Sequence, residues 1–242
     1  MLALVLIAAA FLILAALLGY AVGPPGSQWL GSTLVRGNPA DEAVALTFDD
    51  GPGEATPRIL GTLKKHGVRA TFFLCGQNVE RFPELARRIA EEGHEIGNHT
   101  YSHPLLLWKS PGRIAWEIDR AQKVIAFATG RSPALFRPPY GIRWFGLFPI
   151  LAARGMQTVM WSASGKDWRL PAERIRESVL AETKAGSVIL LHDGVPPREK
   201  GNHLQTAEAL ERILPPLLEQ YRFIPVSEML AESSGLSRKL VV

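Results

Sequence analysis

Five short groups of residues in the sequence carry side chains of the kinds that catalyse hydrolysis. They are TFDDGP at 47–52, HTYSH at 99–103, RPPY at 137–140, Asp167-Trp168 and His192-Asp193. Each group lies just past a short apolar run that has the character of a β-strand. The carboxyl ends of the strands in an α/β barrel meet at one face, where such enzymes assemble their active sites. The sequence therefore predicts that the five groups converge on a single catalytic site.

A metal site is predicted by the spacing of two histidines. His99 and His103 are four residues apart, so one helical turn places both rings on the same side. Pro104 disfavours helix at His103, and we expect a single irregular turn there. Together with one aspartate, the two histidines form a ligand set with open positions that is typical of catalytic zinc or ferrous iron. Taken alone, a histidine pair at this spacing is also common on ordinary helices.

Asp49 and Asp50 are adjacent at the end of the first predicted strand, and we expect them to have different roles. Neighbouring strand residues point to opposite sides, so the two carboxylates cannot act together as the acid pair of a glycosidase. One of them is free to bind a metal while the other contacts the substrate or its water. The alternative is structural, because Asp-Gly-Pro also suits a tight turn.

Arg137 and His192 complete the set of candidate catalytic residues. Two prolines follow Arg137 and present it rigidly, so its guanidinium could hold a carboxylate by a bidentate contact. His192 ends an apolar run, and the period-two alternation of a strand places Leu190 on the same face. A histidine above such an apolar wall can serve as a general acid. The remaining histidines lie away from the other polar groups and are predicted to be structural: His66, His94 and His203.

The elements that must position these residues alternate between strands and helices. Strands are predicted at Ala43–Phe48, Arg69–Leu74, His94–Gly97, Ala134–Arg137, Gln157–Trp161, Ser187–Leu191 and Arg222–Val226. Helical periodicity predicts helices at Pro57–His66, Pro83–Glu92, Arg113–Ala128, Pro171–Lys184 and Leu204–Glu219. This alternation predicts βαβ units and a parallel sheet. Because no dinucleotide-binding glycine motif is present, we favour an α/β fold with a closed or nearly closed barrel over an open doubly wound sheet.

An uncharged apolar segment precedes the predicted barrel. Residues 2–22 contain no Lys, Arg, Asp or Glu, and a helix of this length spans roughly 30 Å, the thickness of a bilayer core. We favour a retained transmembrane helix over a cleaved signal peptide, because the segment has no early basic residue and exceeds the usual apolar length of roughly 7–15 residues. Cleavage is the alternative, since Gly19-Tyr20-Ala21 offers a small-x-small site. Residues 23–40 are expected to form a linker to a barrel domain over residues 41–242.

Composition excludes several other classes of protein. The chain has 242 residues, a formal net charge of +4 and one cysteine, so no intramolecular disulfide can form. Cys75 lies in an apolar run and is predicted to be a buried structural residue. No basic stripe interleaved with aromatics is present, so nucleic acid is not an expected partner. The oligomeric state is left open. Four aromatic residues in loops near the motifs suit sugar stacking, packing or membrane contact equally: Trp108, Trp144, Phe145 and Phe148.

The five groups, in this order, resemble the five motifs of the polysaccharide deacetylases, which are the carbohydrate esterase family 4 enzymes with a NodB homology domain. The resemblance runs from about Ala43 to Val226. It implies a distorted (β/α)7 barrel and metal-dependent removal of N-acetyl groups from amino sugars. One position departs from the family pattern: Ser164 stands where many members have the first acid of Asp-x-x-Asp-Trp. The contribution of that acid to a neighbouring arginine or histidine is therefore left open.

The resemblance implies a role for each motif residue. The metal, usually zinc but with cobalt, nickel or iron also compatible, would be bound by Asp50, His99 and His103. Asp49 would be the general base, oriented by Arg137, and His192 the general acid.

The rest of the implied catalytic set surrounds the acetyl group. Asp167 belongs to the catalytic motifs, and the backbone N–H of Tyr140 would help the metal to hold the oxyanion. Trp168 and Leu190 would form the walls of the acetyl pocket.

The sequence thus predicts a hydrolase that removes N-acetyl groups from an extracytoplasmic glycan, with peptidoglycan as the first expected substrate and a chitin-like oligosaccharide as the second. Its catalytic domain is expected outside the cytoplasm, tethered to the cell membrane by residues 2–22, or secreted if these residues are cleaved. Two alternatives are a deacetylase of a lipid-linked sugar and a glycan-binding pseudoenzyme. A decayed site would lack a ligand, the base or the acid, whereas this sequence retains all of them.

Overall fold

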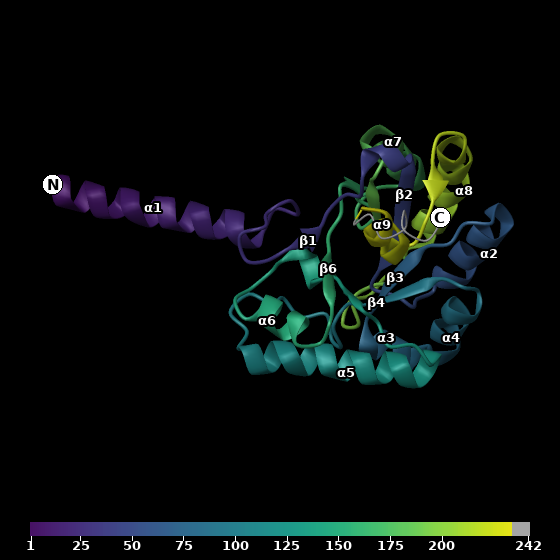
Figure 1. Cartoon of the computed structure of the whole chain (residues 1–242), viewed down its shortest axis with the longest axis horizontal. Helices are drawn as coiled ribbons and strands as arrows, with labels where there is room; N and C mark the ends of the chain where they lie inside the picture. Colours follow the sequence, from purple (N-terminus) through teal and green to yellow (C-terminus); the bar gives the residue numbers. More distant parts are fainter. Residues whose placement is uncertain (234–242) are drawn as a thin grey trace, which may run out of the picture.

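A computed structural model of the chain describes residues 1–233. Its centre is a curled sheet of parallel strands with helices around the outside (Figure 1). The strands of the described residues are β1 Thr33–Leu34, β2 Ala43–Asp49, β3 Thr71–Leu74, β4 Glu95–Asn98, β5 Leu135–Phe136, β6 Gln157–Val159, β7 Ala163–Ser164, β8 Val188–His192 and β9 Arg222–Phe223. Their order is β1-β6-β5-β4-β3-β2-β8-β7, with β9 paired to β2. The expected α/β barrel is confirmed, in a distorted form whose sheet has β1 and β7 at opposite edges.

The helices of the barrel domain connect and cover these strands, and one N-terminal helix precedes them. They are α1 Leu2–Val22, α2 Thr56–His66, α3 Gly76–Arg81, α4 Pro83–Glu91, α5 Pro111–Thr129, α6 Leu147–Ala152, α7 Ala172–Glu182, α8 Leu204–Leu218 and α9 Val226–Ser233. All five helices predicted in the barrel are present, with ends that differ by a few residues. The short helices α3, α6 and α9 were not predicted from the sequence.

The two faces of β2 show how the sheet separates core from site. Val44, Leu46 and Phe48 pack outward into the main apolar cluster with the surrounding helices. The alternate residues Ala43 and Ala45 point into the barrel and join a second apolar cluster there. The same alternation carries Asp49 to the inside of the barrel at the carboxyl end of the strand.

The predicted linker also contributes to the sheet. Within residues 23–40, β1 pairs with β6 through Thr33↔Thr158 and Leu34↔Val159. Beyond β1, Arg36 forms an antiparallel bridge with Ser187, and the N–H of Gly37 donates to the carbonyl of Gly186 at 2.8 Å. This segment therefore crosses from one edge of the sheet to the strand near its other edge.

The N-terminal helix α1 projects away from the barrel (Figure 1). It is long and apolar enough to cross a membrane, with a mean hydropathy of 2.9 over its most apolar 18-residue window. Its last residues differ from the rest, because Ala21 and Val22 are buried. Val22 belongs to an apolar cluster that includes Leu106 and Trp144 of the barrel domain.

Candidate active site

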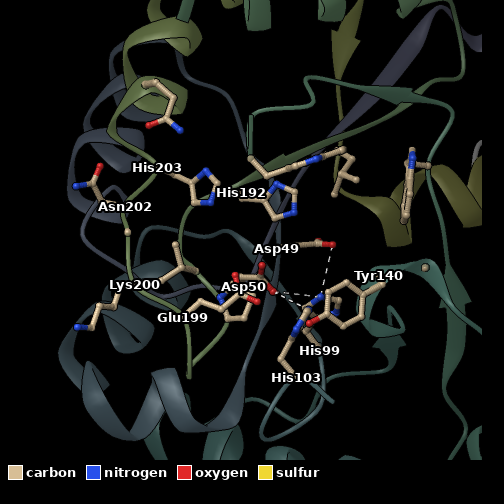
Figure 2. Close-up of a pocket in the computed structure, with 18 residues that line it drawn as sticks. Asp49, Asp50, His99, His103, Tyr140, His192, Glu199, Lys200, Asn202 and His203 are labelled. Carbon is tan, nitrogen blue, oxygen red and sulfur yellow. Dashed lines mark ion pairs between the residues drawn. The ribbon is translucent and has the colours of Figure 1, made fainter. Parts of the chain in front are cut away.

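The five predicted groups converge at the carboxyl edge of the sheet. β2 ends at Asp49 and β8 at His192, and these two residues are register partners on neighbouring strands. His99 directly follows β4, and Arg137 directly follows β5. The shared pocket has a volume of about 600 Å³ (Figure 2). Every predicted metal and substrate residue lines it: Asp50, His99, His103, Tyr140, Trp168 and Leu190.

Asp50, His99 and His103 form a compact group of potential metal ligands. One ligand atom from each residue lies within 4.8 Å of the others, and all three residues are buried. The Oδ1 atom of Asp50 is 3.1 Å from Nε2 of His103 and 3.4 Å from Nε2 of His99. Figure 2 shows the two rings directed at the Asp50 carboxylate. Two imidazoles and one carboxylate are a donor set suited to a catalytic divalent metal with open positions.

Hydrogen bonds and nearby charges set the tautomer and protonation states of these three side chains, and these states suit a metal ligand. Nδ1 of His99 donates to the carbonyl of Arg137 at 2.6 Å, which leaves Nε2 of that ring as the acceptor for a metal. Burial would raise the pKa of Asp50, but the hydrogen bond from His99 and the charges of both histidines outweigh it and lower this pKa. Burial lowers the pKa of His103 to about 4, so its ring is neutral at pH 7, as a ligand must be. Nδ1 of His103 is a buried atom without a hydrogen-bond partner among the described residues.

Asp49 contacts a different partner. Its Oδ1 atom accepts a hydrogen bond from Nη1 of Arg137 at 2.7 Å, while Oδ2 lies 3.7 Å from Nε2 of His99. Arg137 is fully buried, and its guanidinium also donates to the Thr47 hydroxyl at 2.8 Å. Two further bonds run to the carbonyls of residues 159 and 160. The arginine therefore fixes one oxygen of Asp49 and leaves the other directed toward the metal-ligand group.

The departure at Ser164 has a clear structural consequence. Ser164 lies in β7, where its backbone N–H donates to Glu182 and its hydroxyl accepts from the N–H of Lys166. Arg137 is held by backbone carbonyls, Thr47 and Asp49 instead. An acid at position 164 is therefore not needed to hold this arginine in place.

His192 lies on the other side of the pocket, paired with Asp167. Nδ1 of His192 is 2.8 Å from Oδ1 of Asp167, and the backbone N–H of His192 donates to Oδ2 at 2.8 Å. Thr206 donates its hydroxyl hydrogen to the same Oδ2 at 2.7 Å. Burial would lower the pKa of His192, but the charge and hydrogen bond of Asp167 raise it to about 10. The ring is therefore a protonated acid at neutral pH, with its Nε2 side available to the pocket.

One residue in this arrangement belongs to none of the five sequence motifs. His203, predicted to be structural, lies parallel to the His192 ring with centroids 5.3 Å apart, and it also lines the pocket. Its Nδ1 is 3.8 Å from Oδ2 of Asp167. Burial lowers the pKa of His203, so a neutral ring packs on a charged one. Its position directly before a predicted helix, in the loop that follows His192, was the only signal available in the sequence.

Several backbone conformations at the site are unusual. Asp50, Thr100, His103 and Tyr140 all have positive φ, between 51° and 68°, which is the left-handed region that side chains with a Cβ rarely adopt. Each such residue costs on the order of 1–3 kcal/mol and persists only where its surroundings impose it. The clustering of these residues at one pocket marks it as a specialised site.

Comparisons with known proteins agree with this geometry. The family model described as polysaccharide deacetylase matches residues 36–159. A peptidoglycan-N-acetylglucosamine deacetylase of Bacillus cereus is 41% identical over 194 residues, which cover 78% of this chain and 69% of that protein. A chitooligosaccharide deacetylase of Bradyrhizobium is 41% identical over 184 residues, covering 72% of this chain and 84% of that one.

Solved structures show the same relationship. The Bc1960 peptidoglycan N-acetylglucosamine deacetylase has 39% sequence identity and a TM-score of 0.76, over 81% of this chain and 92% of its own. A family 4 pseudoenzyme from Bacillus anthracis, BA3943, has 32% identity and a TM-score of 0.75, over 82% of this chain and 69% of its own. With five motifs gathered at one barrel face, the chain belongs to the polysaccharide deacetylase family of hydrolases, which act on carbon–nitrogen bonds other than peptide bonds.

Proposed function

We propose that this protein is a metal-dependent N-deacetylase of an extracytoplasmic amino-sugar glycan. The observation that carries the proposal is the division of labour around one pocket. Asp50 lies beside two histidines, Asp49 accepts a hydrogen bond from Arg137, and Asp167 favours the protonated form of His192. Metal-assisted amide hydrolysis uses these three functions: a metal site, a base and an acid.

In the proposed mechanism each residue acts at a defined atom. Asp50, His99 and His103 would hold a divalent metal, with zinc expected first, which would polarise the acetamide carbonyl and lower the pKa of the attacking water. Asp49 accepts the proton of that water at Oδ2, because Oδ1 is occupied by Arg137. His192 then donates its Nε2 proton to the departing amine nitrogen, which would otherwise leave as an unstable amide anion.

The remaining pocket residues position the acetyl group. The backbone N–H of Tyr140 stabilises the developing oxyanion, and the left-handed conformation of this residue sets the direction of that N–H. Leu190 is buried in the pocket wall, and the Trp168 ring lies edge-on to His192 at 5.6 Å. These apolar walls suit a methyl group beside the reacting carbonyl.

The substrate is proposed by analogy with the relatives. Peptidoglycan is the first candidate, because several similar proteins are named for it, and chitin-like oligosaccharides are the second. In either case the reacting group is the N-acetyl of an amino sugar.

We further propose that α1 is retained as a membrane anchor, with the barrel outside the cytoplasm. The small-x-small sequence at Gly19–Ala21 is helical, and Ala21 and Val22 are buried against the domain. The Ala21–Val22 bond, where cleavage would occur, lies within the helix between these two buried residues, although Gly19 and Tyr20 before it are exposed. Its packing therefore supports an anchor over a cleaved signal peptide.

The proposal is tested by incubating the zinc-loaded protein with defined acetylated glycans and following acetate release by mass spectrometry. Loss of acetyl groups from an amino sugar, abolished in the His103→Ala variant together with bound metal, is the expected result. About one equivalent of bound metal without any acetate release would instead identify a glycan-binding pseudoenzyme.

A further inference from the structure

The segment that joins α1 to the barrel is fixed to the catalytic side of the molecule. Arg143 lies three residues after Tyr140 and is almost completely buried. Its guanidinium donates to the carbonyls of Pro24, Pro25 and Ser27, and its backbone N–H donates to the carbonyl of Val22 at 3.1 Å. A buried arginine with these partners holds residues 22–27, here called the root of α1, against the loop that carries Tyr140.

The root of α1 also lies beside the mouth of the catalytic pocket. Pro25 lines a shallow cavity of about 350 Å³ together with Trp161 and Trp168. Both tryptophans also line the catalytic pocket. If α1 spans a membrane, the pocket therefore opens close to the membrane surface rather than at the far end of the barrel.

Exposed aromatic side chains are connected to the same end of α1 by ring contacts and a shared apolar cluster. Trp29 is 60% exposed and packs edge-on against Tyr20 of α1 at 5.3 Å. Trp108 and Phe145, 73% and 54% exposed, both contact Trp144, which shares an apolar cluster with the end of α1. Tryptophan and tyrosine are enriched where a protein meets the lipid headgroups. These aromatic residues extend the apolar surface of α1 onto the barrel domain.

A second pocket of about 350 Å³ adjoins the catalytic one and is lined by basic residues. The two pockets share His103, Tyr140 and Glu199, so a ligand could occupy both. The basic side chains of the second pocket are Lys109, Arg113 and Arg198. Arg113 is paired with Glu117, whereas within residues 1–233 no ion pair involves either of the other two. Among the described residues that line this pocket Glu199 is the only acid, so the net charge of the described lining is positive.

From these observations we infer that the substrate is an acetamido sugar joined through phosphate to a membrane lipid. The sugar occupies the metal-site pocket, the phosphate lies among Lys109, Arg113 and Arg198, and the lipid chain enters the bilayer beside Trp108. This assignment rests on the proposed N-deacetylase chemistry and replaces the polymeric glycans named above with a lipid-linked amino sugar as the substrate class. It also gives a reason for the hydrogen bonds by which Arg143 fixes residues 22–27 to the domain, because a substrate in the membrane requires the pocket to stay close to the bilayer.

The test uses the full chain, zinc-loaded and reconstituted into phospholipid vesicles, with three probes that carry the same N-acetylglucosamine. One is joined by diphosphate to a polyprenyl lipid, one is an uncharged glycoside of that lipid, and one is a water-soluble sugar diphosphate. We expect kcat/KM for the lipid diphosphate to exceed that for each of the others by at least about tenfold. Equal kcat/KM values for the lipid diphosphate and the uncharged lipid would overturn the assignment.

Variants separate the contributions of charge and lipid. Lys109→Ala combined with Arg198→Ala should reduce the preference for the diphosphate lipid over the uncharged lipid by at least about tenfold. Lys65→Ala, which removes an exposed lysine of α2, is the matched control and should leave that preference unchanged. Trp108→Ser should reduce the preference for the lipid diphosphate over the soluble diphosphate. If no probe loses acetate while a defined acetylated glycan does, the lipid-phosphate assignment fails and the proposed function stands; if the glycan is also left intact, the proposed function itself fails. If all three lose it at equal rates, only the lipid-phosphate assignment fails.

A measurement independent of activity tests the placement at the membrane. Cys75 is buried, so a fluorophore can be attached selectively to Phe145→Cys or, as a control, to Phe127→Cys. Phe127 is 95% exposed near the C-terminal end of α5, whereas Trp108 and Phe145 cluster with the end of α1. Brominated lipids should quench the label at 145 and not the label at 127. Equal quenching at the two positions would contradict the proposed orientation.

Discussion

At the scale of single residues, the clearest feature is that two adjacent carboxylates have separate partners. Asp49 is the last residue of β2 and points into the barrel, where Arg137 holds it. Asp50 has a φ of 67°, and this turn of the backbone directs its carboxylate toward His99 and His103. The two side chains therefore cannot replace each other, and their substitution should affect different steps.

Asp49→Asn and Asp50→Asn provide the first prediction. Asp49→Asn preserves all three proposed metal ligands but cannot accept a proton, so we expect normal metal content and a rate lower by about 10²–10⁴-fold. Asp50→Asn should lose metal, because a neutral amide is a poorer ligand than a carboxylate. Metal analysis of the purified proteins, combined with acetate-release kinetics, distinguishes the two effects. Metal loss in Asp49→Asn with retention in Asp50→Asn would show that the roles are reversed.

The second prediction concerns the pH dependence set by His192 and Asp167. Burial alone would lower the pKa of His192, but Asp167 raises it to about 10, above the ordinary value of 6.5. The protonated ring is the proposed acid, so activity should persist through neutral pH and fall as pH rises toward this pKa. In Asp167→Asn the raising charge is gone, and the alkaline limb of the kcat profile should move to lower pH.

The control for this experiment is Asp119→Asn, which removes a carboxylate from an exposed pair with Arg154. It should leave the alkaline limb where it is in the wild type. An alkaline limb that stays in place in Asp167→Asn would mean that His192 is not the group whose protonation limits the reaction.

At the scale of elements, the turn after β2 depends on close packing against the end of β8. A Cβ atom at Gly51 would lie 2.2 Å from Oδ1 of Asp193, a buried carboxyl whose pKa burial raises to about 7. Thr56 donates its hydroxyl hydrogen to Oδ2 of the same carboxyl at 2.6 Å. The glycine thus allows the turn that carries Asp50 to approach a residue next to His192.

Gly51→Ala is therefore predicted to destabilise the protein by about 1–3 kcal/mol through overpacking, and to weaken metal binding because Asp50 is displaced. Gly61→Ala is the matched control: no atom lies within 4 Å of its added Cβ, and it sits inside α2. This control should gain up to about 1 kcal/mol from helix propensity. Urea unfolding of both variants measures the effect, and a Gly51→Ala protein as stable as the wild type would refute the packing argument.

The sequence predicts the elements that have a long apolar run or a strong helical periodicity. It does not predict the elements that form only because another part of the chain packs or pairs with them. β2 and β8 were predicted because their apolar runs are long, and with them the convergence of Asp49 and His192. β1 has only two residues and exists because β6 offers it an edge. The position of His203 beside His192 depends on the path of the intervening loop, which no local pattern determines. The left-handed conformation of Asp50 has only a weak sequence signal, since aspartate enters this region more often than most residues but is seldom found there.

At the scale of the whole molecule, the C-terminal end of the apolar helix α1 is packed against the barrel and hydrogen-bonded to it. Figure 1 shows α1 extending from the edge of the sheet that contains β1 and β6. Its final turn belongs to the apolar cluster of the barrel, and the carbonyl of Val22 accepts a hydrogen bond from Arg143. Removal of α1 at Ala21 would cut through a packed, hydrogen-bonded junction rather than an exposed loop.

We therefore predict that the mature protein retains residues 2–22 and stays with the membrane fraction after alkaline carbonate extraction. Intact-mass measurement and N-terminal sequencing of protein isolated from membranes provide the test. Leu12→Arg is the control: a charge at the centre of α1 costs about 2.5–3.5 kcal/mol of insertion free energy and should shift protein out of the membrane fraction. A wild-type N-terminus near Val22 would show instead that α1 is a cleaved signal peptide. In that case Arg143 would still hold Pro24, Pro25 and Ser27 against the barrel, but the catalytic pocket would have no fixed relation to a membrane.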